Sequence, residues 1–146
     1  MVDDILQIYA KDPEMNGIKP DGSKIRVLVV DDSLAFRRLI VRVLTETGYE
    51  VVGEVADGKE ALLKVAELNP DVITMDVTMP ELEGPDAVDV IKRNHPNANI
   101  VMVSSMGHQD LVEKSVKKGA KGYILKPLTG EQIPKMLKVI KKAVLG

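Results

Sequence analysis

The sequence predicts an α/β protein with a doubly wound parallel sheet and helices on both faces. From Ile25 onward, short β-branched runs alternate with amphipathic segments of helical period. The short runs are apolar throughout, which is typical of strands buried on both faces. Glycine and proline breaks separate the segments. Alternation at this spacing indicates right-handed βαβ units and a parallel sheet.

Five strands and five helices are expected in alternation. The strands read IRVLVV at 25–30, EVVGEV at 50–55, VITM at 72–75, IVMVS at 100–104 and GYILK at 122–126. Apolar residues at helical spacing predict helices over 36–44, 61–68, 85–94, 109–118 and 133–140. The first four helices end at Gly48, Asn69-Pro70, His95-Pro96 and Gly119.

Two prolines bear on where helices begin. Pro85 suits the first position of the third helix, where its missing N–H costs nothing. Pro134 lies about five residues after Thr129, the apparent cap of the last helix, and would remove a hydrogen bond there. The last helix therefore either begins later than Thr129 or has a distorted first turn.

Residues 1–24 form an N-terminal extension to a single domain at 25–146. The extension holds Pro13, Gly17, Pro20, Gly22 and five acidic residues, and no period continues after DILQIYA. One short helical turn is expected near residues 5–10. The extension is expected to be either disordered or a docked arm.

Composition limits the class of protein. The chain has 146 residues, 45% of them hydrophobic, so it can bury a core as one domain. It has no cysteine, which excludes disulfides and thiolate metal sites. The first residues carry acids where a signal peptide needs bases, and no apolar run approaches the roughly 20 residues of a membrane span. A cytoplasmic protein without a membrane segment is expected.

The charge is uneven along the chain. Net charge is −2, yet nine lysines and one acid, Glu131, follow from Lys114 to the end. This distribution gives no reason to expect nucleic-acid binding. It fits either a cationic face that meets an acidic partner or a solvated helix surface.

Polar side chains stand at the expected ends of four strands. Asp31 and Asp32 follow the first strand, Asp76 the third and Ser104 ends the fourth, while Lys126 ends the fifth. In an open parallel sheet, ligands bind at these carboxyl ends. Each residue alone has an ordinary explanation, such as a turn residue or a solvated charge. In the DDS stretch, Asp32 or Ser33 could simply cap the first helix.

The combination of these residues points to phosphoryl chemistry. Two carboxylates about 5 Å apart repel by about 3 kcal/mol at an effective dielectric near 20, so three of them need a cation. Lys126 supplies one charge. Oxygen ligands without histidine or cysteine favour Mg²⁺ for the rest. An ionised aspartate beside Mg²⁺ can attack phosphorus and form an acyl phosphate, and the Ser104 hydroxyl can bond a phosphoryl oxygen.

VLVVDDS, ITMDVTMPELEG, VMVSS and GAKGYILKP, in this order, resemble the receiver domain of two-component response regulators over about 25–146. The resemblance implies a flavodoxin-like (βα)5 fold with strand order 2-1-3-4-5. It implies that Asp76 is the phospho-acceptor and that Asp32 binds Mg²⁺ directly, with Asp31 acting partly through water. Thr78 would lend its backbone carbonyl to the metal.

The same resemblance assigns the switch residues. Ser104 takes the place of the family's Ser/Thr, and Lys126 that of its lysine, followed by Pro127, whose preceding peptide bond is often cis in the family. Tyr123 falls where an aromatic residue turns inward on activation, or it is a plain strand aromatic. Thr78 and Met106 stand where the family often has an amide or acid that orients a hydrolytic water. Slow self-dephosphorylation and a separate phosphatase are therefore expected.

The chain is most similar to the CheY family of stand-alone chemotaxis receivers. The resemblance implies a monomeric switch that catalyses only its own phosphorylation and dephosphorylation. It implies phosphoryl transfer from a CheA-like histidine kinase and binding to a FliM-like protein of the flagellar motor switch. No output domain is expected after the last helix.

Three other functions are weighed. A stand-alone receiver could serve as a phosphorelay intermediate or in a pathway other than chemotaxis, which the sequence does not exclude. A hydrolase of the haloacid-dehalogenase type would carry its nucleophile on the first strand, in an acid-x-acid pattern, with a cap domain; neither is found. A degenerate receiver that only scaffolds would not keep the full set of strand-end residues.

Overall fold

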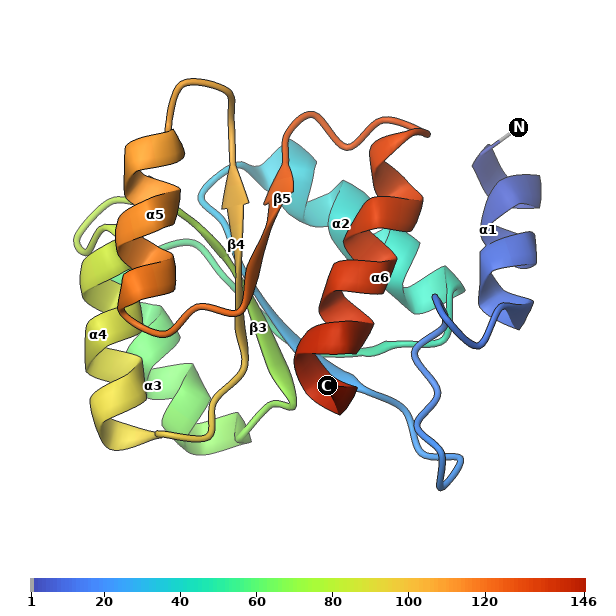
Figure 1. Cartoon of the computed structure of the whole chain (residues 1–146), viewed down its shortest axis with the longest axis horizontal. Coiled ribbons are helices and arrows are strands. Elements are labelled where there is room, and N and C mark those ends of the chain that lie inside the picture. Colours follow the sequence, from blue (N-terminus) through green and yellow to red (C-terminus); the bar gives the residue numbers. More distant parts are fainter. Residues whose placement is uncertain (1) are drawn as a thin grey trace.

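The computed structural model describes residues 2–146, and its centre is a five-stranded parallel sheet (Figure 1). The strands are β1 (Arg26–Val30), β2 (Glu50–Val55), β3 (Val72–Asp76), β4 (Ile100–Ser104) and β5 (Gly122–Leu125). Their order is β2-β1-β3-β4-β5 and every neighbouring pair is parallel. The predicted doubly wound fold and strand order are confirmed.

The described residues form six helices, one more than the sequence predicted. They are α1 (Val2–Lys11), α2 (Leu34–Glu46), α3 (Gly58–Leu68), α4 (Gly84–Asn94), α5 (Gln109–Lys117) and α6 (Gln132–Leu145). The cap of α2 is Ser33, whose hydroxyl accepts the N–H of Phe36. In the described part of the chain, no helix is long and apolar enough to cross a bilayer.

The helices cover the sheet on both faces (Figure 1). One face packs against α2 and α6, and the other against α3, α4 and α5. Both cores are largely aliphatic, and all five residues of β3 are buried. Burial on both faces explains why the strands read as continuous apolar runs.

Both prolines occupy first helical turns. Pro85 is the second residue of α4. Pro134 is the third residue of α6, whose cap is Glu131 rather than Thr129. The first N–H groups of a helix have no partner within it, so neither proline removes a helix hydrogen bond. Of the two alternatives for the last helix, the later start is the observed one.

The N-terminal segment begins with a ten-residue helix, longer than the single turn expected at residues 5–10. This helix, α1, packs against α2, and the side chain of Leu6 is completely buried. The chain then continues to β1, and on the way Lys19 forms an ion pair with Asp71 at 2.9 Å. We call residues 2–24 the N-terminal arm.

The two edges of the sheet differ from its centre. At one edge, β2 pairs with β1 with a register shift between Val27 and Leu28. Glu50 and Glu54 are exposed on β2. At the other edge, β5 has only four residues.

Candidate functional site

Three carboxylates meet at the carboxyl end of the sheet. Asp31 and Asp32 are the first residues after β1, and Asp76 is the last residue of the neighbouring strand β3. One oxygen from each of the three lies within 4.8 Å of the others. Asp31 and Asp76 are buried, whereas Asp32 is exposed. The structure thus brings together the acids that the sequence placed at strand ends.

Lys126 joins this cluster from the far side of β4. Its Nζ lies 2.8 Å from Asp31 Oδ2 and 2.8 Å from Asp76 Oδ2. The backbone N–H of Lys126 donates to the Ser104 carbonyl at 2.8 Å, which fixes the end of β5 against β4. The peptide bond between Lys126 and Pro127 is cis. One ammonium therefore bridges two of the three carboxylates.

The charges perturb one another's protonation. Burial raises the pKa of Asp31, and the charge of Asp76 adds to this, which outweighs the contacts of Asp31 with Lys126 and with the Ser33 N–H. Burial alone would lower the pKa of the Lys126 ammonium, but its ion pairs with Asp31 and Asp76 prevail and raise the pKa. The cluster keeps an excess of negative charge, which favours binding of a cation.

The residues around Asp76 are oriented by short loops. The Thr78 N–H donates to Asp76 Oδ1 at 3.0 Å. The Ser104 hydroxyl is buried beside the cluster but donates to the Ser105 carbonyl at 2.9 Å. Tyr123 lies apart from the cluster on β5, with 51% of its surface exposed. Of the residues named from sequence, the structure brings Asp31, Asp32, Asp76 and Lys126 into one site and leaves Tyr123 outside it.

The donor set fits a hard divalent cation. It consists of carboxylate oxygens, the ligands that Mg²⁺ prefers. Asp31 Oδ2 is buried and, apart from its charge contact with Lys126, receives no directional hydrogen bond from the described residues. That oxygen retains capacity to bind a cation. Asp31, Asp32 and Asp76 could hold Mg²⁺ at this end of the sheet.

Two residues at the site were not found from the sequence. The ring of Phe36 lies 4.5 Å from Lys126 Nζ and supports the ammonium through a cation–π contact. An Arg37 N–H donates to the Asp31 carbonyl at 2.7 Å and holds the loop after β1. Their one signal in the sequence was their position in the first helical turn after DDS. At that position an apolar residue such as Phe36 is normally assigned to the hydrophobic core.

The sequence profile of the response regulator receiver domain matches residues 27–138. The chain therefore belongs to the response regulator receiver domain family, whose members are signalling switches of two-component systems that bind Mg²⁺ at an acidic pocket. Such domains do not turn over an external substrate as enzymes do.

Within this family the chain is similar to chemotaxis proteins. It is 44% identical to the chemotaxis protein CheY of Thermotoga maritima over 117 residues, 80% of this chain and 98% of the relative. It is 41% identical to CheY of Treponema pallidum over 119 residues, 80% and 83% of the two chains. In a solved CheX-CheY-BeF3-Mg complex from Borrelia burgdorferi, the matching chain is 33% identical with a TM-score of 0.81, over 89% of this chain and 97% of that one. The likeness supports a chemotaxis-type response regulator.

Proposed function

We propose that this chain accepts a phosphoryl group on Asp76 from a histidine kinase, in a reaction that requires Mg²⁺. The observation that carries the proposal is the position of Lys126 Nζ, 2.8 Å from both Asp31 and Asp76 at the carboxyl end of the sheet. An ammonium so placed can pair with Asp76 before the reaction and with phosphoryl oxygens after it. A purely structural ion pair would not need Asp32 as a third acid within 4.8 Å.

The side chain of Asp76 is the nucleophile. One of its oxygens forms a bond to phosphorus while the bond from phosphorus to the phosphohistidine nitrogen breaks, and the electron pair returns to the imidazole. No general base is needed, because an aspartate with a reference pKa near 4 is already ionised at neutral pH. The Thr78 N–H and Lys126 hold the two Asp76 oxygens at 3.0 and 2.8 Å and fix the direction of attack.

Magnesium completes the site. Asp31, Asp32, Asp76 and the backbone carbonyl of Thr78 would hold the ion. When bound, Mg²⁺ supplies neutralisation of the phosphoryl oxygens and alignment of donor and acceptor.

The switch begins with a change of hydrogen-bond partner. Phosphorylated Asp76 carries extra negative charge and acceptor oxygens. We expect the Ser104 hydroxyl to leave the Ser105 carbonyl and donate to the phosphoryl group. The ring of Tyr123 borders a cavity of about 250 Å³ that Ser104 also lines. Tyr123 can therefore turn from its exposed position toward Ser104 and change the surface between β5 and α6.

Stoichiometric phosphorylation tests this chemistry. The protein is incubated with Mg²⁺ and acetyl phosphate that carries a labelled phosphoryl group. The label bound to the protein is quantified and tested for stability in acid and lability in base. We expect one acyl phosphate per chain, absent from Asp76→Asn and after chelation of Mg²⁺. Asp110→Asn, at an exposed aspartate on α5, is the matched control and should label normally. Label that persists in Asp76→Asn would refute the assignment.

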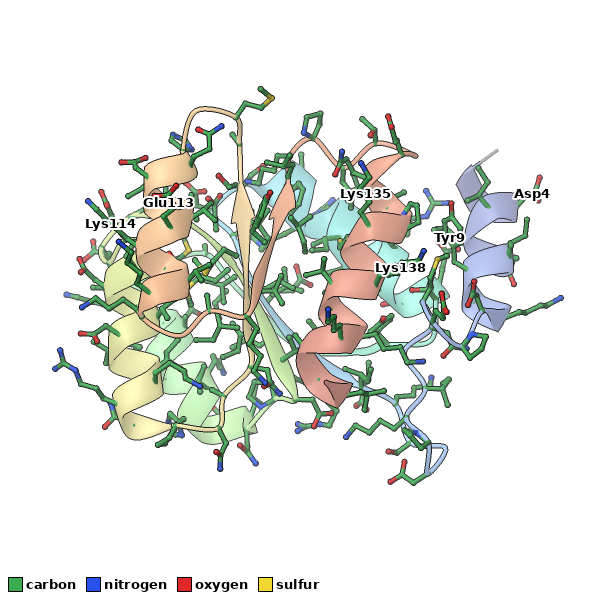
Figure 2. The ribbon with its side chains drawn as sticks, in the orientation of Figure 1. Asp4, Tyr9, Glu113, Lys114, Lys135 and Lys138 are labelled. Carbon is green, nitrogen blue, oxygen red and sulfur yellow. The ribbon has the colours of Figure 1, made fainter. Side chains whose placement is uncertain are left out.

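The output we propose is control of flagellar rotation in chemotaxis, with a CheA-like kinase as phosphodonor and a FliM-like switch protein as target, in the cytoplasm and as a monomer. The basis is the similarity to CheY proteins and the face between β5 and α6. Figure 2 shows Lys135 and Lys138 on α6. Lys135 lines a cavity of about 450 Å³ with Tyr123. Apolar walls with a lysine rim suit an acidic amphipathic peptide.

A pull-down with and without beryllofluoride tests the output. A FliM-like protein retained only in the presence of beryllofluoride and Mg²⁺ supports a motor target. Retention of partners from another pathway would favour the second candidate, a stand-alone receiver outside chemotaxis.

We also expect a separate phosphatase, because Thr78 and Met106 carry no amide or acid to orient an attacking water. The Borrelia relative was solved in a complex with CheX.

A further inference from the structure

The N-terminal arm is attached to α6 by buried polar contacts. Lys141 on α6 is only 8% exposed, and its Nζ donates to the Pro13 carbonyl at 2.5 Å and to Asn16 Oδ1 at 2.9 Å. The Tyr49 hydroxyl donates to the Met15 carbonyl at 2.7 Å and lies 3.3 Å from the Leu137 carbonyl of α6. A buried ammonium that gave up these acceptors would be left unsatisfied, so the contacts hold arm and helix together.

The arm also fits closely at one glycine. Gly17 donates to the Thr47 carbonyl at 3.0 Å and accepts from the Ile25 N–H at 2.7 Å. A β-carbon at position 17 would lie 2.5 Å from Tyr49 Cγ and 2.6 Å from the Tyr49 backbone. Side chains essentially never approach so closely, so any larger residue at position 17 would lift the arm from Tyr49.

The arm and the groove use opposite sides of the same helix. The groove is the cavity of about 450 Å³ between β5 and α6, and Lys135 and Val139 line it. Lys141, which meets the arm, follows Val139 by two positions, or about 200° around a helix of 3.6 residues per turn. Figure 2 shows Tyr9 on the side of α1 that faces α6, while Asp4 points away. The helix α6 therefore lies between the arm and the groove.

The groove side of α6 is in close contact with β5. A β-carbon on Gly122 would lie 2.9 Å from Val139 Cγ1, so strand and helix approach as near as a glycine permits. Tyr123, the next residue, borders the groove on one side and the cavity beside Ser104 on the other. A shift of α6 would change the space on the exposed side of this ring and leave the other side as it is.

We propose that the N-terminal arm is a regulatory brace that holds α6 against β5 and thereby sets the ratio of the exposed and inward positions of Tyr123. This proposal rests on the proposed function, in which Tyr123 belongs to the switching surface. Coupling between two sites is reciprocal, so activation at Asp76 must in turn change how firmly the arm is attached. The arm and Asp76 would both act on the same element, which is α6 together with the Tyr123 ring that α6 confines.

The three tyrosines of the chain report on both ends of this coupling. Tyr9 and Tyr49 contact the core on the side of the arm, whereas Tyr123 lies at the groove. Labelling with 3-fluorotyrosine gives one ¹⁹F signal for each, assigned by single Tyr→Phe variants. The measured quantities are the ratio of Tyr123 populations and the shifts of Tyr9 and Tyr49, without and with beryllofluoride and Mg²⁺.

Two variants detach the arm by different means. Gly17→Val places atoms where Tyr49 lies, and Lys141→Met removes the ammonium but keeps the stem of the side chain. Their matched controls are Gly130→Ala, where a β-carbon meets nothing within 4 Å, and Lys142→Met, at the exposed neighbouring lysine. If Gly17→Val does not fold, Lys141→Met alone decides the test.

We expect the arm variants to change the Tyr123 ratio by about fivefold, the low end of coupling between two protein sites, and the controls to leave it unchanged. In the unmodified protein, beryllofluoride with Mg²⁺ should also shift Tyr9 or Tyr49. An unchanged Tyr123 ratio in the arm variants, with and without beryllofluoride, would overturn the brace and leave the arm a structural cap. If no ¹⁹F signal of the unmodified protein responds to beryllofluoride, the result counts against the proposed function. The Tyr123 population ratio of the arm variants, measured without beryllofluoride, would still test the brace.

Discussion

Replacing Lys126 by methionine tests the electrostatic reasoning about the site. In the absence of Mg²⁺, Lys126 is the cation that separates Asp31 from Asp76, with 2.8 Å to each. The substitution keeps most of the aliphatic stem and removes the charge. We expect Lys126→Met to be strongly destabilising at neutral pH and nearly tolerated in acid.

The magnitude follows from distances in the cluster. At an effective dielectric near 20, each contact of 2.8 Å is worth about 6 kcal/mol of attraction, and two acids whose oxygens lie within 4.8 Å of each other repel by about 3.5 kcal/mol or more. Without Lys126 only the repulsion and the burial cost remain. A carboxyl group escapes both by binding a proton. This costs about 1.4 kcal/mol for each pH unit above a reference pKa near 4, or about 4 kcal/mol at pH 7.

Protonation therefore limits the loss, and the limit depends on pH. The folded variant holds a proton that its unfolded chain releases above about pH 4, so its stability falls as pH rises. The expected loss is about 4 kcal/mol at pH 7 and about 1.4 kcal/mol at pH 5. The stabilising charge of Lys126 in the unmodified protein does not change over this range, because its pKa is raised above 10.5.

Urea unfolding at pH 5, 6 and 7 in EDTA measures these values. Adding Mg²⁺ should restore stability by about 1.4 kcal/mol for each tenfold excess over its dissociation constant. Lys135→Met, at an exposed lysine of α6, is the control and should stay within about 0.5 kcal/mol of the unmodified protein. A loss below about 1 kcal/mol at pH 7, or the same loss at pH 5 and pH 7, would refute this account.

Three further predictions concern single residues. Because burial and then Asp76 raise the pKa of Asp31, the folded state binds protons more readily there, and stability falls as pH rises through that pKa. Asp31→Asn should therefore raise the free energy of unfolding of the Mg²⁺-free protein at pH 7, with the gain vanishing toward pH 4; a net loss at pH 7 would contradict this. Tyr49→Phe should cost about 1–2 kcal/mol in urea unfolding, since it removes the donor to the Met15 carbonyl, and no loss would show that this contact is dispensable. The phosphorylated protein alone should lose its phosphoryl group over minutes or longer, because Thr78 and Met106 cannot orient water; a half-life of seconds, followed with labelled phosphate, would show that another group does so.

Most of the fold could be predicted because its signals are local. Each strand is a continuous apolar run with a break on either side, and Asn69 ends α3 in the left-handed conformation that asparagine can adopt at a helix C-terminus. The acids of the site were found because parallel strands place their ends at one edge of the sheet. The strand order came from the resemblance, since alternation alone does not fix which strands are neighbours.

The remaining features depend on contacts between distant residues. The seating of the arm requires that Gly17 meet Tyr49 and that Pro13 meet Lys141, and no periodicity shows such pairs. The support of Lys126 by Phe36 joins residues ninety positions apart in the chain. The position of Pro134 depended on the helix beginning at Gln132, which the apparent cap at Thr129 concealed.

The two outermost strands of the sheet affect whether the protein aggregates at high concentration. A border strand with free N–H and C=O groups invites another chain to add to it, which is one route to aggregation. The register shift beside β2 and its outward Glu50 and Glu54 make a poor template there, because a second chain would meet an uneven ladder and two negative charges. The four residues of β5 offer too short a run for lasting pairing. Growth into fibrils by strand addition is thus disfavoured at either margin.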